Sequence, residues 1–363
     1  MLNHSVISAE LPTPGSLAAF GWNESVATRY LPYDEHGHHL VRIVRVDRES
    51  CVVATAAGVT NCRSGSSQLG PVTGDWAVAR DTPDGGLILH ELLPRTTMVL
   101  RGNATATGEQ VLVANIDTMF ILHGVDRPHR VGRLQRLAIL SWEAGVHPVI
   151  VLTKIDLVGT EEAVIGIEDA ITEINKVVHD IEVVSTSSLT GEGVDSLRPY
   201  LIAGHTVGLL GESGAGKSSL VNQLLDKVVQ STGDIRDGDH KGRHTTTSRD
   251  LVPIPGGAVL VDTPGLRSIS MPAANAGLAR AYTDLETFAE ECRFRDCTHV
   301  VEPGCAIQAA MKDGELTPER WEGYQKLQRE MSVEAERTAI RARQAESRTA
   351  RRRRRVEPDA DEW

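Results

Sequence analysis

The sequence lacks the features of secreted and membrane proteins. Residues 1–22 have no cationic start and no continuous apolar core, so we expect no signal peptide. No apolar run approaches the ~18 residues that a membrane-spanning helix needs. The five cysteines are an odd number, which does not fit a secreted disulfide framework. These absences predict a cytoplasmic protein with reduced cysteines and no membrane partner.

Positive charge and aromatic side chains are also scarce. Lys and Arg number 38 against 49 Asp and Glu, so the net charge is −11, and aromatics make up 4% of residues. Such a chain does not coat nucleic acid with its whole surface, and any RNA contact must come from local basic patches. Hydrophobic residues make up 40% of the 363 residues. That content can fill the cores of two or three domains and excludes global disorder.

A glycine-rich loop carries the strongest chemical signal. Residues 211–218 fit the phosphate-binding pattern G-x-x-x-x-G-K-[ST] at every fixed position. A buried strand is predicted before the loop at 206–210 and a helix after it at 219–227. An ordinary glycine-rich turn is the alternative, and these intact flanks argue against it. We expect a nucleoside triphosphate to contact Gly211, Glu212, Ser213, Gly214, Ala215, Gly216, Lys217, Ser218 and Ser219.

Two residues of this loop have assigned chemistry. The ammonium of Lys217 is expected to contact the β- and γ-phosphates, and the hydroxyl of Ser218 to bind Mg²⁺. Candidates to complete the magnesium site lie downstream. Of three consecutive threonines we favour Thr246 as the Mg²⁺ ligand that senses the γ-phosphate, although the register is open. Asp262, after a predicted strand at 258–261, would hold Mg²⁺ through water, and the N–H of Gly265 would meet the γ-phosphate.

A guanine site is predicted at the end of another strand, 148–152. It is followed by Thr153, Lys154, Ile155 and Asp156. A carboxylate at Asp156 can accept from both N1–H and the exocyclic amine of guanine, a donor pair that adenine lacks. The Lys154 stem can lie along the base. A strand at 182–184 leads to Ser185, where a backbone N–H of a second loop could meet the guanine oxygen.

The order of these motifs is unusual. The guanine motif at 153–156 precedes the phosphate loop at 211–218, and Asp262–Gly265 comes last, whereas ordinary GTPases begin with the phosphate loop. The elements can still form one site because each follows a strand of one parallel sheet. The order therefore predicts a circularly permuted GTPase domain over residues 96–270, with helices on both faces of the sheet.

The sequence before this domain predicts a small β-barrel. Residues 1–38 are rich in Pro, Gly and His, and we interpret them as a mobile or loosely packed extension with a short helix near 17–30. Short strands follow at 40–46, 51–59, 75–80 and 87–92, which favour a five-stranded OB-type barrel over 39–95. Trp76 is expected in its core. Its arginines, Arg42, Arg45, Arg63 and Arg80, are as consistent with solvation as with RNA contact.

The C-terminal part combines a metal pattern with a basic tail. Cys292, Cys297, His299 and Cys305 have the spacing C-x₄-C-x-H-x₅-C, typical of a closed structural zinc site in a helical domain over 271–335. Cys51 and Cys62 stand apart and are expected to be buried apolar residues. A helix is predicted over 318–355, with an apolar stripe that begins at Trp321 and Tyr324. The Arg-rich tail over 336–363 is interpreted as an RNA-contacting arm, against the alternative of an idle solvated tail.

These parts together resemble the RsgA/YjeQ family, bacterial GTPases that depend on the small ribosomal subunit. The matching stretches are 74–76, 241–247, 262–265 and the zinc spacing, within a resemblance that covers roughly 39–320. The resemblance implies a ribosome-stimulated GTP hydrolase that uses GTP/GDP, Mg²⁺ and one Zn²⁺, binds small-subunit rRNA and drives late maturation of that subunit. We also expect a monomer. One departure is Thr153, where many GTPases have Asn, and the loss of that amide would loosen guanine affinity.

The resemblance also suggests a catalytic residue. Leu266 stands where many GTPases have the glutamine that orients water, so intrinsic hydrolysis should be slow. The resemblance points to His244 as the water-orienting residue once the ribosome orders its loop. Lys217 and Thr246 are the other residues expected to act in catalysis, and a solvated histidine is the alternative for His244.

Two other functions are possible for the chain. One is an RNA-binding zinc module whose nucleotide domain is a switch with negligible turnover, and the other is a P-loop kinase, which Lys154 and Asp156 argue against.

Overall fold

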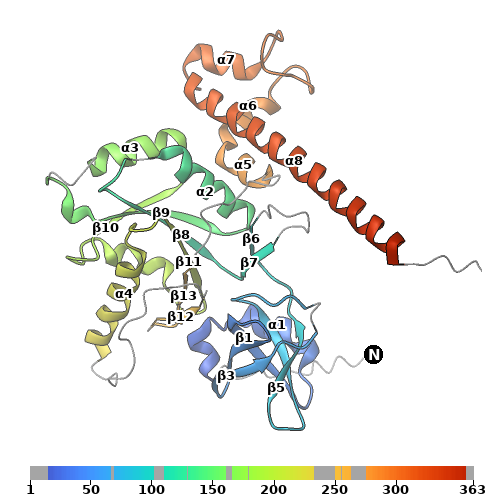
Figure 1. Cartoon of the computed structure of the whole chain (residues 1–363). Helices are drawn as coiled ribbons and strands as arrows, with labels where there is room; N and C mark the ends of the chain where they lie inside the picture. The colour runs from blue at the N-terminus through green and yellow to red at the C-terminus, as the bar shows by residue number, and fades with distance from the viewer. Residues whose placement is uncertain are drawn as a thin grey trace, which may run out of the picture.

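The computed structural model describes residues 15–66, 69–101, 110–128, 130–160, 166–178, 180–232, 250–254, 256–262 and 275–356. A barrel, a sheet flanked by helices, and a helical C-terminal part follow one another along the molecule (Figure 1). Among the described residues no helix is long and apolar enough to cross a membrane. His244, Thr246 and Gly265 lie outside the described residues.

The barrel is closed and five-stranded, which confirms the predicted OB-type architecture. Its strands are β1 (His38–Val46), β2 (Ser50–Thr55), β3 (Gly58–Arg63), β4 (Trp76–Asp81) and β5 (Leu87–Leu92), in the order β1-β2-β3-β5-β4. The predicted single strand over 51–59 was wrong, because the chain turns between Thr55 and Gly58 to form the β2–β3 hairpin. Trp76, Cys51 and Cys62 are buried, as expected.

The N-terminal segment packs against the barrel. It contains the 3₁₀ helix η1 (Gly15–Phe20), the helix α1 (Glu24–Tyr30) and the short 3₁₀ turn η2 (Leu31–Tyr33). Asn23 begins α1, because its side-chain oxygen accepts a hydrogen bond from the N–H of Val26 at 3.0 Å. Leu17, Val26 and Tyr30 are each no more than 3% exposed. The described part of this extension is therefore packed, and the predicted loose packing was wrong for it.

Among the described residues, the central sheet has six strands in the order β10-β9-β8-β11-β13-β12 (Figure 1). They are β8 (Thr118–Gly124), β9 (His147–Thr153), β10 (Glu182–Thr186), β11 (Thr206–Gly211), β12 (Leu251–Pro253) and β13 (Val259–Asp262). All neighbours are parallel except β12, which runs antiparallel to β13. A separate two-stranded sheet, β6 (Met98–Arg101) and β7 (Gln110–Ala114), precedes it and was not predicted.

Helices cover both faces of this sheet because its strands are apolar on both sides. Alternate residues of β8 belong to different cores: Met119 packs in the core that includes α2 (Val131–Glu143) and α3 (Ile167–Val177). Phe120 packs with Leu220 of α4 (Lys217–Thr232) in the other. The layered arrangement agrees with the expected α/β domain. The short 3₁₀ elements η3 (Ile155–Leu157) and η4 (Val194–Tyr200) complete the described connections.

The C-terminal part consists of α5 (Asn275–Ala281), α6 (Thr283–Glu290), α7 (Ala306–Asp313) and α8 (Pro318–Val356). At its junction with the sheet domain, Leu278 and Tyr282 share an apolar core with Ile139 of α2, and buried polar contacts add to it. Arg320, 7% exposed, donates to Asp284 and to the main-chain carbonyls of Val177 and Ala281. The far half of α8 projects away from the rest of the molecule (Figure 1). This course confirms the predicted C-terminal helix.

The barrel and the sheet domain meet at a buried arginine. Arg42 of β1 is 1% exposed and donates to the carbonyls of Phe20 and Asn115, at 2.6 and 3.2 Å, and to the Thr206 hydroxyl at 2.8 Å. Its guanidinium lies 4.9 Å from the centre of the Trp76 ring. Burial lowers the pKa of Arg42 to about 10, so the side chain remains charged at neutral pH. Arg42 is therefore neither solvated nor available to RNA, and that expectation was wrong.

Replacing Arg42 should weaken the barrel junction specifically. Arg42→Met removes three donors and leaves the acceptors buried, so we expect a loss of about 2–4 kcal/mol in the free energy of unfolding, measured by urea denaturation. Arg63→Met is the matched control, because Arg63 forms an exposed ion pair with Asp84 and should cost less than about 1 kcal/mol. Equal effects of the two substitutions would contradict this role for Arg42.

Candidate functional site

The predicted nucleotide motifs meet at one edge of the central sheet. Thr153 ends β9, Thr186 ends β10, Gly211 ends β11 and Asp262 ends β13, and these strands run parallel. Parallel strands place their carboxyl ends at the same edge, where ligands of such sheets bind. The chain order of the motifs therefore does not prevent them from forming one site.

The phosphate loop has the backbone conformation that its glycines allow. Gly214 and Gly216 have φ angles of 78° and 85°, in the region that favours glycine. The ammonium of Lys217, the first residue of α4, donates to the main-chain carbonyls of Gly211 at 2.8 Å and Glu212 at 3.0 Å. The lysine side chain thus folds back over its own loop. Ser218 and Ser219 lie in the first turn of α4 and are exposed.

Arg127, between β8 and α2, and Arg133, in the first turn of α2, contact the loop from outside. Arg127 donates to the Ser213 carbonyl at 3.1 Å and to the Glu212 carboxylate at 3.3 Å, and Arg133 also binds Glu212. Burial disfavours the charged carboxylate, but the nearby arginines keep the pKa of Glu212 below its usual value. Arg136 of the same helix is also paired, because it binds Glu330 of α8 at 2.5 Å.

A buried hydrogen bond joins the guanine motif to the phosphate loop. The hydroxyl of Thr153, which is 1% exposed, donates to the main-chain carbonyl of Ala215 at 2.9 Å. Ala215 is itself 1% exposed. The departure from the common Asn at this position therefore has a structural role: the threonine hydroxyl fixes the distance between the two loops.

The two residues expected to contact guanine are each held by a neighbour. Lys154 has a left-handed backbone, with φ 63°, and its ammonium lies 2.6 Å from the carboxylate of Asp126. Burial of Asp126 opposes its ionisation, yet Lys154 and Arg127 keep its pKa below the usual value. The carboxylate of Asp156 accepts a hydrogen bond from the Ser187 hydroxyl at 2.5 Å.

Several of these partners were not identified from the sequence. Asp126, Arg127 and Ser187 belong to no fixed position of a motif, although Ser187 lies in the predicted second guanine loop. Ser185 lies within β10 rather than after it, two residues before Ser187. Ile155 is 8% exposed and packs below the motif, and Asp262 is described only as the last residue of β13.

The predicted zinc ligands form a compact cluster in the C-terminal part. The candidate ligand atoms of Cys292, Cys297, His299 and Cys305 all lie within 4.8 Å of one another. Nδ1 of His299 lies 3.4 Å from the Cys292 sulfur and 3.5 Å from the Cys305 sulfur, and these two sulfurs are 4.0 Å apart. Tetrahedral zinc with bonds of about 2.3 Å to sulfur needs sulfurs about 3.8 Å apart. The donor set and its spacing therefore fit one zinc ion with no open position.

Helix α7 supports the thiolate form of one ligand. Burial of Cys292 opposes ionisation, but the N–H groups of Ala306 and Ile307 at the start of α7 lower its pKa below the usual value. The N–H of Ala306 lies 3.4 Å from the sulfur. Gln308 of the same helix donates to the His299 carbonyl at 2.7 Å and so fixes the loop that carries the histidine. A thiolate is the species that binds zinc.

Comparison with known proteins identifies relatives over most of the chain. A family model described as RsgA GTPase matches residues 92–272. A small ribosomal subunit biogenesis GTPase RsgA of Opitutus terrae is 37% identical over 341 residues, which cover 89% of this chain and 91% of the relative. A protein of the same name from Streptomyces avermitilis is 40% identical over 329 residues, covering 86% of this chain and 85% of the relative.

Two solved structures share the fold. The crystal structure of YjeQ from Thermotoga maritima aligns with a TM-score of 0.59 and 24% identity, over 81% of this chain and 98% of that one. The structure of YloQ, a circularly permuted GTPase, aligns with a TM-score of 0.56 and 22% identity, over 83% of this chain and 98% of that one. The likeness supports the permuted order of the sheet and its flanking barrel and helices.

The Thr153 hydrogen bond should contribute to guanine-nucleotide affinity. Thr153→Val removes the donor while keeping the shape, so the Ala215 carbonyl remains buried without it. We expect the GDP dissociation constant to rise about 3- to 10-fold, measured with a fluorescent GDP analogue. Thr153→Ser keeps the hydroxyl and should stay within about twofold of the unsubstituted protein. Equal affinities for the Val and Ser variants would show that the hydroxyl is not needed.

The cysteine cluster should hold one structural zinc ion. We expect one zinc per chain by elemental analysis, and its removal by a chelator should unfold the 292–305 segment, since such ions supply much of the folding free energy of small modules. Acid should release the metal, because protons compete for the thiolates as pH falls. Cys297→Ser should lower zinc content, whereas Cys62→Ser in the barrel should not. Full zinc retention in the Cys297 variant would exclude the proposed ligand set.

Proposed function

The chain belongs to the RsgA GTPase family, and we propose that it binds the small ribosomal subunit through rRNA and hydrolyses GTP to drive a late step of that subunit's maturation. It is a GTP hydrolase. The observation that carries the proposal is the convergence of Thr153, Asp156 and Lys217 at one sheet edge, together with relatives that are named small ribosomal subunit biogenesis GTPases. We also infer a cytoplasmic monomer.

Different loops bind different parts of the nucleotide. The Asp156 carboxylate accepts from the two guanine donors, and Ser187 keeps that carboxylate oriented. Lys154, held by Asp126, lies along the base, while Lys217 leaves its loop carbonyls to neutralise the β- and γ-phosphates. The hydroxyls of Ser218 and Thr246 would hold Mg²⁺, whose charge would offset that of the triphosphate.

Hydrolysis depends on a partner. Leu266 supplies no side chain that can orient water, so the intrinsic reaction is slow. We assign this role to His244 in the ribosome-bound state, with its imidazole as acceptor for a water proton. An outside contribution of this kind is worth about 10³ to 10⁵ in rate. His244, Thr246 and Gly265 are assigned from the sequence, since they lie outside the described residues.

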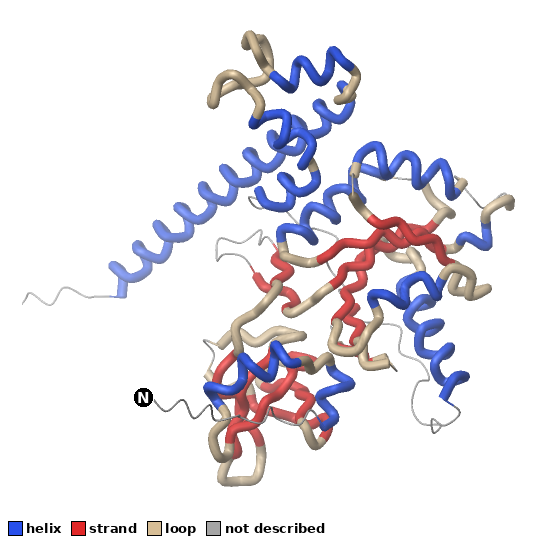
Figure 2. The backbone as a smooth tube through the Cα atoms, turned by 180° about the vertical axis from the view of Figure 1, so that it is seen from behind, coloured by secondary structure: helices blue, strands red, loops and turns tan. Residues whose placement is uncertain are grey.

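The ribosome contact is assigned to the projecting end of α8. Residues 337–355 carry Arg337, Arg341, Arg343, Arg348 and Arg351–Arg355, against one acidic residue, Glu346. This helix end extends into solvent (Figure 2). Clustered arginines on an accessible helix bind RNA phosphates by replacing counterions. The charge is local, as a chain of net charge −11 requires.

Hydrolysis should respond to small subunits through His244. We expect purified small subunits to stimulate steady-state GTP turnover at least about 100-fold, because they supply the missing water orientation. His244→Ala should keep GTP affinity and lose the stimulation, and Lys217→Ala should lose nucleotide binding. Unchanged stimulated turnover in the His244 variant would remove this residue from the mechanism. Negligible turnover of the unsubstituted protein with small subunits would favour a binding switch instead.

The arginine-rich end of α8 should account for part of the ribosome affinity. Deleting residues after Arg337 removes eight arginines, so affinity for small subunits should fall and its salt dependence should flatten. Pelleting with small subunits at several KCl concentrations measures both. A variant with Arg351–Arg355 changed to Gln provides a control of unchanged length. Binding and salt slope equal to those of the full chain would show that the tail is idle.

A further inference from the structure

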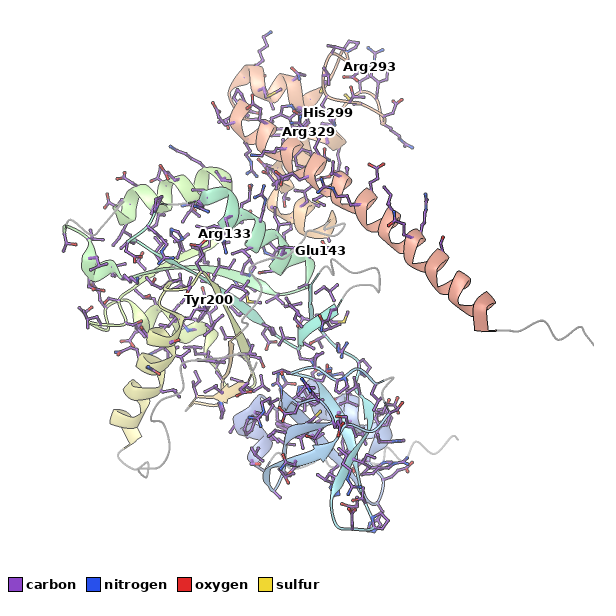
Figure 3. The ribbon with its side chains drawn as sticks, in the orientation of Figure 1. Arg133, Glu143, Tyr200, Arg293, His299 and Arg329 are labelled. Atoms are coloured by element: carbon purple, nitrogen blue, oxygen red, sulfur yellow. The ribbon has the colours of Figure 1, made fainter. Side chains whose placement is uncertain are left out.

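A cleft of about 280 Å³ lies between the zinc-ligand segment and α8. Its walls include Thr298 and His299 on one side and Trp321, Tyr324, Gln325 and Gln328 of α8 on the other. His299 lies in the upper part of the molecule beside α8, whose Trp321 ring it contacts (Figure 3). The volume is near the lower end of ligand pockets, so it suits a single side chain rather than a large ligand.

The cleft has an aromatic wall. The rings of Trp321 and Tyr324 stack with an interplanar angle of 25° and a centroid distance of 5.7 Å, and the His299 ring meets Trp321 edge-on at 5.7 Å. Both α8 aromatics are only partly buried. The apolar stripe of α8 therefore packs on the zinc module but leaves aromatic surface in the cleft. Such surface attracts planar or cationic groups.

Carboxylates flank the same cleft. The Tyr324 hydroxyl donates to Glu286 at 3.3 Å, and Thr298 donates to Glu302 through its hydroxyl and its N–H. These hydrogen bonds lower the pKa of Glu302 to about 2, so it is anionic at neutral pH. Three thiolates and one Zn²⁺ would add a net charge of −1 at the adjoining wall.

Charge is separated along the C-terminal part. Residues 283–332, the range that contains all the residues lining the cleft, include eleven acidic residues and six Lys or Arg, whereas the arginines concentrate from residue 337 onward. Arg329 of α8 is exposed, and its Nε donates to the main-chain carbonyl of Gln325 at 3.2 Å. An RNA phosphate backbone is therefore favoured at the far end of α8 and disfavoured at the cleft.

We infer that this cleft binds an arginine side chain from an extended basic segment of a partner protein. The guanidinium stacks on Trp321 or Tyr324. Its N–H groups donate to the side-chain amide oxygen of Gln325 or Gln328, and its positive charge is attracted by the Glu286 carboxylate. The chemistry favours arginine over lysine because only a planar guanidinium can stack and donate in several directions at once. This site is separate from the nucleotide site, and its binding requires neither GTP nor the ribosome.

The test uses the full-length, zinc-loaded protein without nucleotide or ribosome. The probes are a 12-residue Gly/Ser peptide containing three arginines, the same peptide with citrulline, and a 12-nucleotide single-stranded RNA. The readout is the indole N–H resonance of Trp321, assigned by its loss in Trp321→Phe. We expect the arginine peptide to shift this resonance and to bind at least tenfold tighter than the citrulline peptide, since citrulline keeps the planar shape but lacks the charge and two of the N–H donors.

Two matched variants separate the cleft from general charge. Glu286→Gln should weaken arginine-peptide binding at least fivefold, whereas Glu168→Gln, an exposed change on α3 with the same loss of charge, should leave it within twofold. Equal binding of the arginine and citrulline peptides, equal effects of the two variants, or a Trp321 shift with RNA alone would each overturn the inference. None of these outcomes bears on GTP turnover, so failure here is distinct from failure of the proposed function.

Discussion

The hydrogen bond from the Thr153 hydroxyl to the Ala215 carbonyl is the contact on which the nucleotide site depends. It links two loops that are 62 residues apart in the chain, and both partners are buried. A guanine nucleotide must bind Asp156 through its base and Lys217 through its phosphates. The distance between the two loops must therefore match the length of the nucleotide. Parallel strands bring the loops to one sheet edge, and this bond then fixes their spacing.

Helix α2 connects this site to the C-terminal part. Arg133 at its start binds Glu212 of the phosphate loop, and Glu143 at its end accepts from the N–H of Gly277 in α5 at 2.8 Å. Between them, Gln135 donates to the Tyr282 hydroxyl at 2.7 Å. One helix thus carries polar contacts to the phosphate loop and to the zinc module.

Much of this architecture could be predicted from the sequence, because periodicity, glycine loops and ligand spacing are local signals. They identified the barrel, the permuted sheet, the phosphate loop and the zinc cluster. Arg42 and Arg133 could not be interpreted in this way, since burial and pairing depend on segments distant in the chain, such as Thr206 and Glu212. The β2–β3 turn was missed because no Asn-Gly or Pro signal marks it.

Nucleotide discrimination tests the central claim most directly, namely that these loops form one guanine site. Competition of unlabelled GDP and ADP against a fluorescent GDP analogue, in the presence of Mg²⁺, measures both affinities on the same protein. If Asp156 and Lys217 act on one ligand, GDP should bind at least about 100-fold tighter than ADP, because adenine offers no donor pair to the carboxylate and leaves it unpaired. Equal affinities for the two nucleotides would contradict the account.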